Sequence, residues 1–245
     1  MSIIQLIAGS AIVQVLLTLV LYTLYAMLVG LAMTPSAALV LWGVETLLQQ
    51  GRWFAFAMVL GGSLFLFFAS AILVLGLAIR LLSWGVQPGR YPFKSFTVLR
   101  WLIYSGIFTL MNNYVLPVVP MSFLTNAFFR IIGCKMGKNV KLNSHMLNDA
   151  YLLTLGDDVI IGGQTDISCH LYENGHLILQ PISIGDKTVI GAHCYISPGV
   201  RIGKRCVIGL GCYVRKDKVI EDDSRVTSVA SVSLSTANKI EKGRF

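Results

Sequence analysis

Residues 184–203 read IGDKTVIGAHCYISPGVRIG, with an apolar β-branched residue at every sixth position. The spacing continues without a miss through Ile184, Ile190, Ile196, Ile202, Ile208, Val214, Ile220, Val226 and Val232. Such a sustained six-residue period is typical of a parallel β-helix. Glycine follows several of these residues, as at Gly185 and Gly191, where it permits a corner conformation and close backbone stacking.

A shorter phase of the same period precedes this run. Its members are Leu155, Ile161 and Ile167, with a fainter start at Met136 and Leu142. The step from Leu142 to Leu155 is 13 residues and the step from Ile167 to Ile184 is 17, and neither is a multiple of six. We therefore expect interruptions of the coils within residues 143–154 and 168–183. Loops on a rigid scaffold are places where functional residues concentrate.

The first third of the chain has a different composition. Of the 245 residues 55% are hydrophobic and only 13% charged, and Glu45 and Arg52 are the only charged residues before residue 80. This excludes a fully soluble monomer and a disordered chain. Residues 3–33 and 53–79 are uncharged stretches of 31 and 27 residues, and about 20 suffice to cross a bilayer. We expect the first helix to break at Pro35 and residues 37–50 to form a short interfacial helix.

Residues 101–129 are also uncharged, but they contain three asparagines and two prolines, which are costly in hydrocarbon. We expect an interfacial or re-entrant segment there. Arg80, Arg90, Lys94 and Arg100 follow the second span and place that side, with both termini, in the cytoplasm. The expected organisation is transmembrane helices in 1–85, an interfacial or re-entrant linker in 86–133, a β-helix domain in 134–232 and a C-terminal tail in 233–245.

The five cysteines form no CxxC pair, which argues against a zinc site and a disulfide scaffold and fits a reducing compartment. Cys194, Cys206 and Cys212 occupy the small fifth position of a hexad, so we expect them to point into the coils. The net charge of +8 lies entirely in the part of the chain from Arg80 onward, which indicates a membrane region joined to a basic polar domain. Membrane lipids are an expected partner. No nucleic-acid partner is expected.

Three segments carry a resemblance to a known family. LGDDVIIG (155–162), IGDKTVIG (184–191) and ISPGVRIG (196–203) resemble the hexapeptide-repeat acyltransferases, which fold as a left-handed parallel β-helix. GRYP (89–92), LRW (99–101) and HLYENG (170–175) are similar to the C-terminal membrane-plus-β-helix region of polylysine-synthetase-type peptide synthetases and their stand-alone relatives. The resemblance implies a membrane α-helical N-terminal region joined to an all-β domain on the cytoplasmic side of a bacterial inner membrane.

The resemblance also implies a general base. In this family a histidine in the loop before a coil such as PISIG (181–185) has that role, and here it is His170, with His176 as the competitor. A histidine near pH 7 can take a proton from a hydroxyl or amine that attacks a thioester. Asp149 could hold the imidazole tautomer or position the acceptor. Glu173 could orient the histidine or bind an amine acceptor, or be an ordinary surface charge.

Further residues are expected to bind the substrates. Tyr172, His176 and Asn148 are assigned to the acceptor. The resemblance implies acyl-coenzyme A as donor, bound between the subunits of a homotrimer near the C-terminal coils. The residues expected at that groove are Gly191, Ala192, Gly209, Gly211, Arg215 and Lys216, and solvent or headgroup contacts are the alternative for the basic ones. No metal is expected, because the spacing from His170 to His176 is one residue longer than the spacing in carbonic-anhydrase-like β-helices.

These observations favour a membrane-anchored acyltransferase that moves an acyl group, first of all acetyl, from a thioester to a hydroxyl or amine. One alternative is an aminoacyl or peptide-bond-forming transferase, served in trans by a carrier-protein thioester and biosynthetic partner enzymes. The other is a non-catalytic trimeric membrane scaffold.

Overall fold

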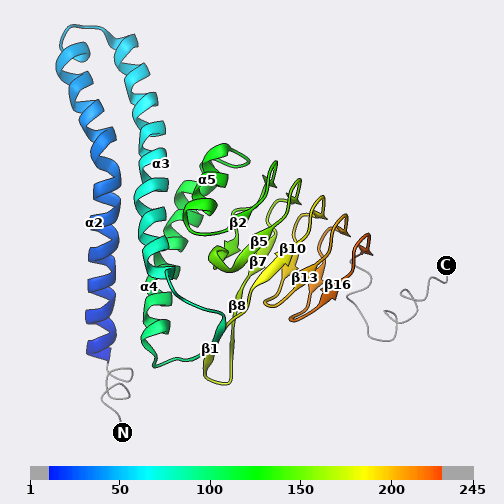
Figure 1. Cartoon of the computed structure of the whole chain (residues 1–245). Helices are drawn as coiled ribbons and strands as arrows, with labels where there is room; N and C mark the ends of the chain where they lie inside the picture. The colour runs from blue at the N-terminus through cyan, green and yellow to red at the C-terminus, as the bar shows by residue number, and fades with distance from the viewer. Residues whose placement is uncertain (1–10, 228–245) are drawn as a thin grey trace.

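A computed structural model describes residues 11–227. Figure 1 shows a pair of long helices, a group of shorter helices beside it, and a stack of β-coils that extends away from both. Residues 3–10 of the first expected span, Val232 of the repeat and the expected tail 233–245 lie outside the described residues.

Fourteen short strands build the coils. They are β2 (Lys135–Met136), β3 (Lys141–Leu142), β4 (Leu147–Asn148), β5 (Leu153–Leu155), β6 (Ile160–Ile161), β7 (Asp166–Ser168), β10 (Ile182–Ile184), β11 (Val189–Ile190), β12 (Tyr195–Ile196), β13 (Arg201–Ile202), β14 (Val207–Ile208), β15 (Tyr213–Val214), β16 (Val219–Ile220) and β17 (Arg225–Val226). They form three parallel sheets, in the orders β16-β13-β10-β5-β2, β17-β14-β11-β6-β3 and β15-β12-β7-β4. The expected fold, a left-handed parallel β-helix, is confirmed.

The register explains the six-residue period. Ile184 pairs with Ile202, and Ile202 pairs with Ile220, so three hexapeptides make one full coil. The repeated residues from Ile184 to Ile220 are all buried, and Cys194, Cys206 and Cys212 are buried with them. Each buried isoleucine contributes about 1.5–3 kcal/mol relative to an exposed one. The inward position expected for the three cysteines is therefore confirmed.

The first interruption is smaller than the sequence predicts. Strand β4 lies inside the expected range 143–154, and Leu147 fills the inward position one residue early. Only Asp149 and the 3-10 turn η4 (Ala150–Leu152) separate β4 from the next coil. The six-residue rule failed here because the step from Leu142 to Leu147 is five residues and the step from Leu147 to Leu155, which includes η4, is eight.

The second interruption is a β-hairpin. Strands β8 (His170–Glu173) and β9 (His176–Leu179) pair antiparallel within the expected range 168–183. Strand β1 (Gly89–Pro92), which precedes the shorter helices in sequence, pairs antiparallel with β9. The hairpin therefore joins the coils to the helical part of the chain.

The long helices are α2 (Ala11–Gly43), which continues as the π-helix η1 (Val44–Leu48), and α3 (Trp53–Ser83). By length and composition, the segments Thr18–Leu48 and Trp53–Ser83 can each cross a membrane. The expected break at Pro35 and the separate interfacial helix over 37–50 are wrong, because α2 runs through both. A proline removes one N–H, which apolar helices tolerate. The hydroxyls of its neighbours Thr34 and Ser36 donate to the preceding backbone carbonyls of Gly30 and Met33.

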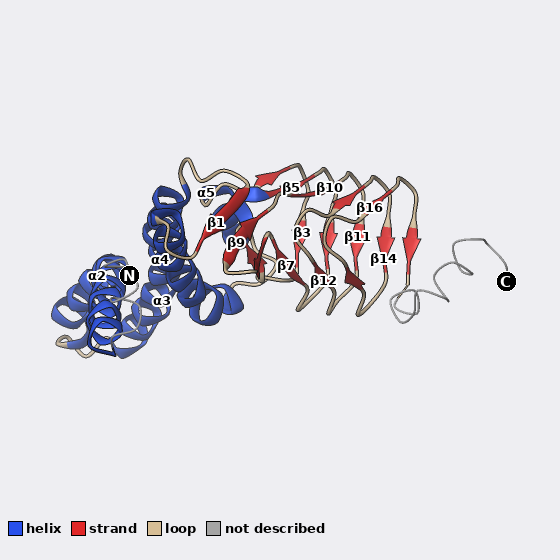
Figure 2. Cartoon of the chain, turned by 90° about the horizontal axis from the view of Figure 1, so that it is seen from below, coloured by secondary structure: helices blue, strands red, loops and turns tan. Residues whose placement is uncertain are grey.

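The expected interfacial or re-entrant segment is divided into four pieces. They are α4 (Phe96–Leu110), the π-helix η2 (Met111–Val115), the 3-10 helix η3 (Leu116–Val118) and α5 (Phe123–Ile131). Trp101, Tyr104 and Phe128 from these pieces are buried in one continuous core with α3 and the first coils. Figures 1 and 2 show that α2 and α3 run across the N-terminal end of the β-helix and not along its axis.

Candidate active site

The two interruptions of the coils meet at one place. Strands β4 and β7 pair in parallel, with Asn148 opposite Ser168, so the residues that follow them are neighbours. Asp149 follows β4 with a left-handed backbone (φ 53°), which aspartate adopts more readily than most residues. Its side chain is only 1% exposed. One carboxylate oxygen, Oδ2, accepts a hydrogen bond from Nδ1 of His170 at the start of β8.

A third residue completes this arrangement. The indole Nε1 of Trp101, on α4, donates a hydrogen bond of 2.7 Å to the other oxygen of Asp149, Oδ1. The Trp101 ring also stands edge-on to the His170 ring, with centroids 4.9 Å apart. Both oxygens of a buried carboxylate are thus occupied by N–H donors from different parts of the chain. The sequence singled out the LRW segment but assigned no role to Trp101.

The imidazole of His170 has the environment of a general base. With Nδ1 directed at Asp149, the other ring nitrogen, Nε2, is left to accept a proton. The side chain keeps 23% of its surface exposed. Burial lowers the pKa of His170, but the hydrogen bond and charge of Asp149, with the charge of Asp166, outweigh it and raise the pKa above the ordinary value.

Two of the residues assigned to the acceptor lie beside this pair. Tyr172 is half exposed, and its ring lies 6.0 Å from His170 and 5.6 Å from Trp101. The ring of Phe93 lies a further 5.3 Å from Tyr172, so an aromatic rim borders the histidine. Asn148 donates to Asp166 Oδ1 at 2.9 Å and holds that second carboxylate near His170.

Glu173 and His176 have other partners. Successive side chains of a strand point to opposite faces, so Glu173 is directed away from Tyr172, and it forms an exposed ion pair of 3.1 Å with Lys216. Within the described residues, the carboxylate that is hydrogen-bonded to the histidine is that of Asp149 and not that of Glu173. His176 contacts the carbonyl of Asn174 in the hairpin turn, at 2.8 Å. The structure thus unites His170 with Asp149 and leaves His176 apart.

The glycines expected at a coenzyme A groove have a structural explanation first. A Cβ on Gly191 would lie 2.7 Å from the backbone nitrogen of Leu210 in the next coil, and a Cβ on Gly209 would lie 3.2 Å from the Val226 carbonyl. Close stacking therefore accounts for these two. A Cβ on Gly211 would point into open space, but its left-handed backbone (φ 67°) favours glycine there. Ala192 is half-buried, and Arg215 and Lys216 are exposed. Gly211, Arg215 and Lys216 remain able to contact a donor.

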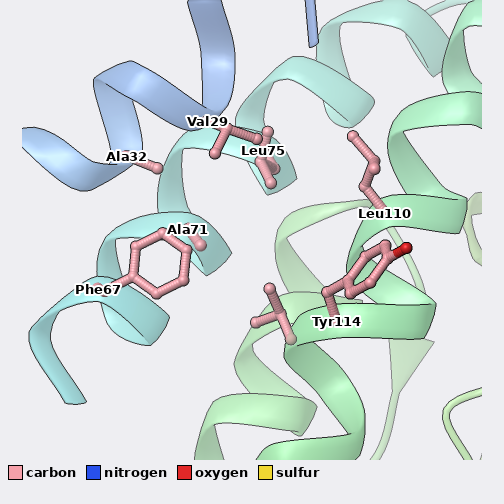
Figure 3. Close-up of a pocket in the computed structure, with 8 residues that line it drawn as sticks. Val29, Ala32, Phe67, Ala71, Leu75, Leu110 and Tyr114 are labelled. Carbon is pink, nitrogen blue, oxygen red and sulfur yellow. The ribbon is translucent and has the colours of Figure 1, made fainter. Parts of the chain in front are cut away.

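A metal cluster and an apolar cavity are the other kinds of site to consider in the described part of the chain. Within residues 11–227, no three histidine, cysteine, aspartate or glutamate side chains are grouped so that they could hold a metal ion. Figure 3 shows a cavity of about 240 Å³ between the long helices and α4–η2. It is lined by Val29, Ala32, Phe67, Ala71, Leu75, Leu110, Tyr114 and Val115. This lining is apolar and contains no acid–base pair.

Comparisons with known proteins agree with the fold. A family model, the hexapeptide repeat of succinyl-transferase, matches residues 181–216. The chain is 35% identical over 114 residues to the galactoside O-acetyltransferase of Escherichia coli (strain K12), an alignment that covers 43% of this chain and 53% of that protein. Residues 181–216 thus match a hexapeptide-repeat family model, and the chain is similar to acetyltransferases of that type.

A second relative agrees with the narrower resemblance. The chain is 27% identical over 143 residues to a delta-poly-L-ornithine synthetase of Acinetobacter baumannii (strain AB307-0294), covering 58% of this chain and 10% of that protein. The chain thus spans about a tenth of one curated relative and about half of the other. Among solved structures, a maltose O-acetyltransferase from Clostridium difficile 630 is similar at 20% identity, with 53% of this chain and 83% of that chain covered and a TM-score of 0.39.

Proposed function

We propose that the protein is a membrane-anchored acyltransferase that moves an acyl group, acetyl in the simplest case, from a coenzyme A thioester to a hydroxyl or amine. The observation that carries the proposal is the pairing of His170 with the buried Asp149 beside a half-exposed aromatic rim. The names of two relatives, the galactoside O-acetyltransferase and a putative acetyltransferase of Bacillus subtilis (strain 168), support acetyl as the group.

The side chains perform the transfer as follows. His170 Nε2 takes the proton of the acceptor as its oxygen or nitrogen forms a bond to the thioester carbonyl carbon. Asp149 stabilises the imidazolium that results, because its Oδ2 stays hydrogen-bonded to Nδ1. When the carbon–sulfur bond breaks, His170 returns the proton to the departing thiolate. The products are an ester or amide and a free thiol, and His170 is neutral again.

The long helices support a membrane location. Large apolar side chains are exposed along both, among them Leu19, Met27, Phe65 and Leu73. Helices that are apolar all round are typical of membrane spans, whereas helices that lie along a membrane surface have a polar face. We propose that both cross the bilayer, with the coils on the cytoplasmic side.

The expected homotrimer stays a prediction, and the observed arrangement of helices and coils sets a condition on it. α2 and α3 run across the end of the β-helix. A three-fold axis parallel to the axis of the β-helix would therefore place the three helix pairs in one plane perpendicular to that axis. Three such pairs could not all cross one flat bilayer. A homotrimer closed around the coils therefore requires helix pairs that are turned relative to the coils. Native mass spectrometry in detergent tests for it.

The polyornithine synthetase similarity favours one second function. The acyl group would then be an aminoacyl group delivered by the phosphopantetheine thioester of a carrier protein, and partner enzymes would charge that carrier. His170 would remove a proton from the attacking amine in the same way. The third possibility, a non-catalytic scaffold, gives no reason for a buried carboxylate held against a histidine.

Product analysis distinguishes these functions. The full chain in lipid nanodiscs is incubated with acetyl-coenzyme A or a charged carrier protein and a panel of hydroxyl and amine acceptors, and the products are identified by mass spectrometry. His170→Ala should lower turnover about 10²-fold or more. His176→Ala should stay within about twofold of the wild type, because the ring of His176 is hydrogen-bonded to the Asn174 carbonyl in the hairpin turn, while Asp149 is hydrogen-bonded to His170. Full activity of His170→Ala would overturn the proposal, and product from the carrier protein alone would favour the second function.

A further inference from the structure

Trp101 belongs to the helical part of the chain, yet it contacts the proposed acid–base pair directly. It lies in the second turn of α4 and is 7% exposed. Its Nε1 donates to Asp149 Oδ1 at 2.7 Å, and its ring is edge-on to both His170 and Tyr172. No other hydrogen bond joins α4 to the side chain of Asp149 within the described residues.

The chemistry of the indole suits it to fix a carboxylate. An indole N–H donates only and does not titrate, so it holds Oδ1 at every working pH. A carboxylate can turn about its Cβ–Cγ bond, and a donor on Oδ1 leaves Oδ2 for the imidazole. A buried carboxylate oxygen without a hydrogen-bond partner is destabilising. Asp149 therefore depends on this donor to keep Oδ2 directed at His170.

Trp101 is itself held by the residue before it. The Arg100 guanidinium donates to the carbonyls of Leu82 and Trp84, at 2.7 and 2.6 Å, and so ties the start of α4 to the end of α3. The adjoining β1 pairs with the hairpin that carries His170. The end of the apolar helix pair, Trp101 and the hairpin thus form one connected unit.

We propose that Trp101 is a positioning residue for the transfer described above: it orients Asp149, and through Asp149 the base His170, so that α4 completes a site otherwise built on the coils. This inference rests on the proposed function. It implies that the β-helix without α4 lacks part of its active site, although the proton-transferring groups lie in the coils and the hairpin.

Few charges compete with Asp149 for control of His170. The titratable groups that face the pair are Asp166, Tyr172, Tyr104, Tyr151 and Cys169. Burial raises the pKa of each tyrosine and of Cys169, so these groups stay neutral near pH 7. Asp149 and Asp166 are left to raise the pKa of His170. A carboxylate that turns away from the imidazole therefore lowers that pKa.

Three variants test the role. Trp101→Phe keeps an aromatic ring and removes the N–H, and it should lower kcat about 10- to 100-fold with the donor KM within about twofold. Trp101→His should recover part of kcat, because histidine Nε2 is as many bonds from the backbone as indole Nε1. Trp53→Phe makes the same change at an exposed position at the far end of α3 and should match the wild type. Thermal unfolding of each variant confirms that it is folded.

A double-mutant cycle shows whether Trp101 acts through Asp149. In an Asp149→Ala background, Trp101→Phe should lower kcat less than twofold further. An undiminished effect in that background, or full kcat in Trp101→Phe alone, would overturn the inference and leave the proposed function intact.

A readout without turnover separates the inference from the function. Diethyl pyrocarbonate modifies neutral imidazole, so the pH dependence of His170 modification, followed by peptide mass spectrometry, reports the pKa of His170. In Trp101→Phe the midpoint should move to lower pH, whereas in Trp53→Phe it should not move. An unchanged midpoint in Trp101→Phe would contradict the inference even if no acceptor had been found.

Discussion

Replacing Asp149 by asparagine isolates the part of the site on which catalysis depends most. The two side chains have nearly the same shape, so the change leaves no cavity at a position that is 1% exposed. The amide NH₂ of asparagine can face Nδ1 of His170 only as a donor. Nδ1 would then be the unprotonated nitrogen, and Nε2 would carry the hydrogen and lose its ability to accept a proton.

The size of the loss follows from the role of a general base. Such a base raises the reaction rate about 10²- to 10⁴-fold, and the carboxylate-to-amide change in a serine protease triad lowers kcat about 10⁴-fold. For Asp149→Asn we expect a decrease in kcat of about 10³-fold, which is equivalent to an activation barrier higher by about 4 kcal/mol. Release of thiol from acetyl-coenzyme A, followed with a thiol reagent, measures it, and the five buried cysteines limit the background.

Asp166→Asn is the matched control. Asp166 also raises the pKa of His170, but through its charge, since its side-chain partner is Asn148. This variant should lose less than about tenfold. The reasoning about the buried pair would be refuted if kcat of Asp149→Asn stayed within tenfold of the wild type, or if Asp166→Asn lowered kcat more than Asp149→Asn.

Two further predictions concern the fold and the membrane. Gly191→Ala should lower the free energy of unfolding by about 1–3 kcal/mol, because its Cβ would meet the backbone of the next coil. In the control Gly163→Ala the nearest contact of the Cβ is a side chain, so the free energy of unfolding should fall by less than about 1 kcal/mol. Equal decreases for the two variants in thermal unfolding would contradict the stacking argument. Gln50→Cys, placed in the turn between α2 and α3, should react with an impermeant maleimide only from the membrane face opposite the coils. Labelling from the face of the coils would show that the helix pair lies along the membrane.

Local regularity decided which parts of the fold could be predicted. The inward residues of the C-terminal coils repeat every six positions, so Ile184 and its successors identify the coils without a structure. Leu147 escaped that rule because one corner is a residue shorter. Pro35 led to a wrong prediction for a different reason: a single missing N–H stops many helices, but an apolar helix tolerates it, and α2 continues.

The residues of the candidate site also differ in whether the sequence could predict them. His170 and Asp149 lie 21 residues apart in sequence, but each falls in an interruption of the repeat, and stacked coils place such interruptions together. Trp101 lies 48 residues before Asp149 on a helix with no periodic relation to the coils. Its hydrogen bond depends on how α4 packs against the first coils, which no local pattern in the sequence encodes.

The pH dependence of transfer by the wild-type chain tests the central claim, that His170 paired with Asp149 is the base, most directly. A base must be neutral to accept a proton, so kcat/KM should be low in acid and rise with pH. Because Asp149 raises the pKa of His170, the midpoint should lie above about 6.5, the ordinary value for histidine. In Asp149→Asn the midpoint should move to lower pH while the plateau falls. A wild-type rate that does not change between pH 5 and pH 9, or a midpoint that is the same in Asp149→Asn, would contradict the account.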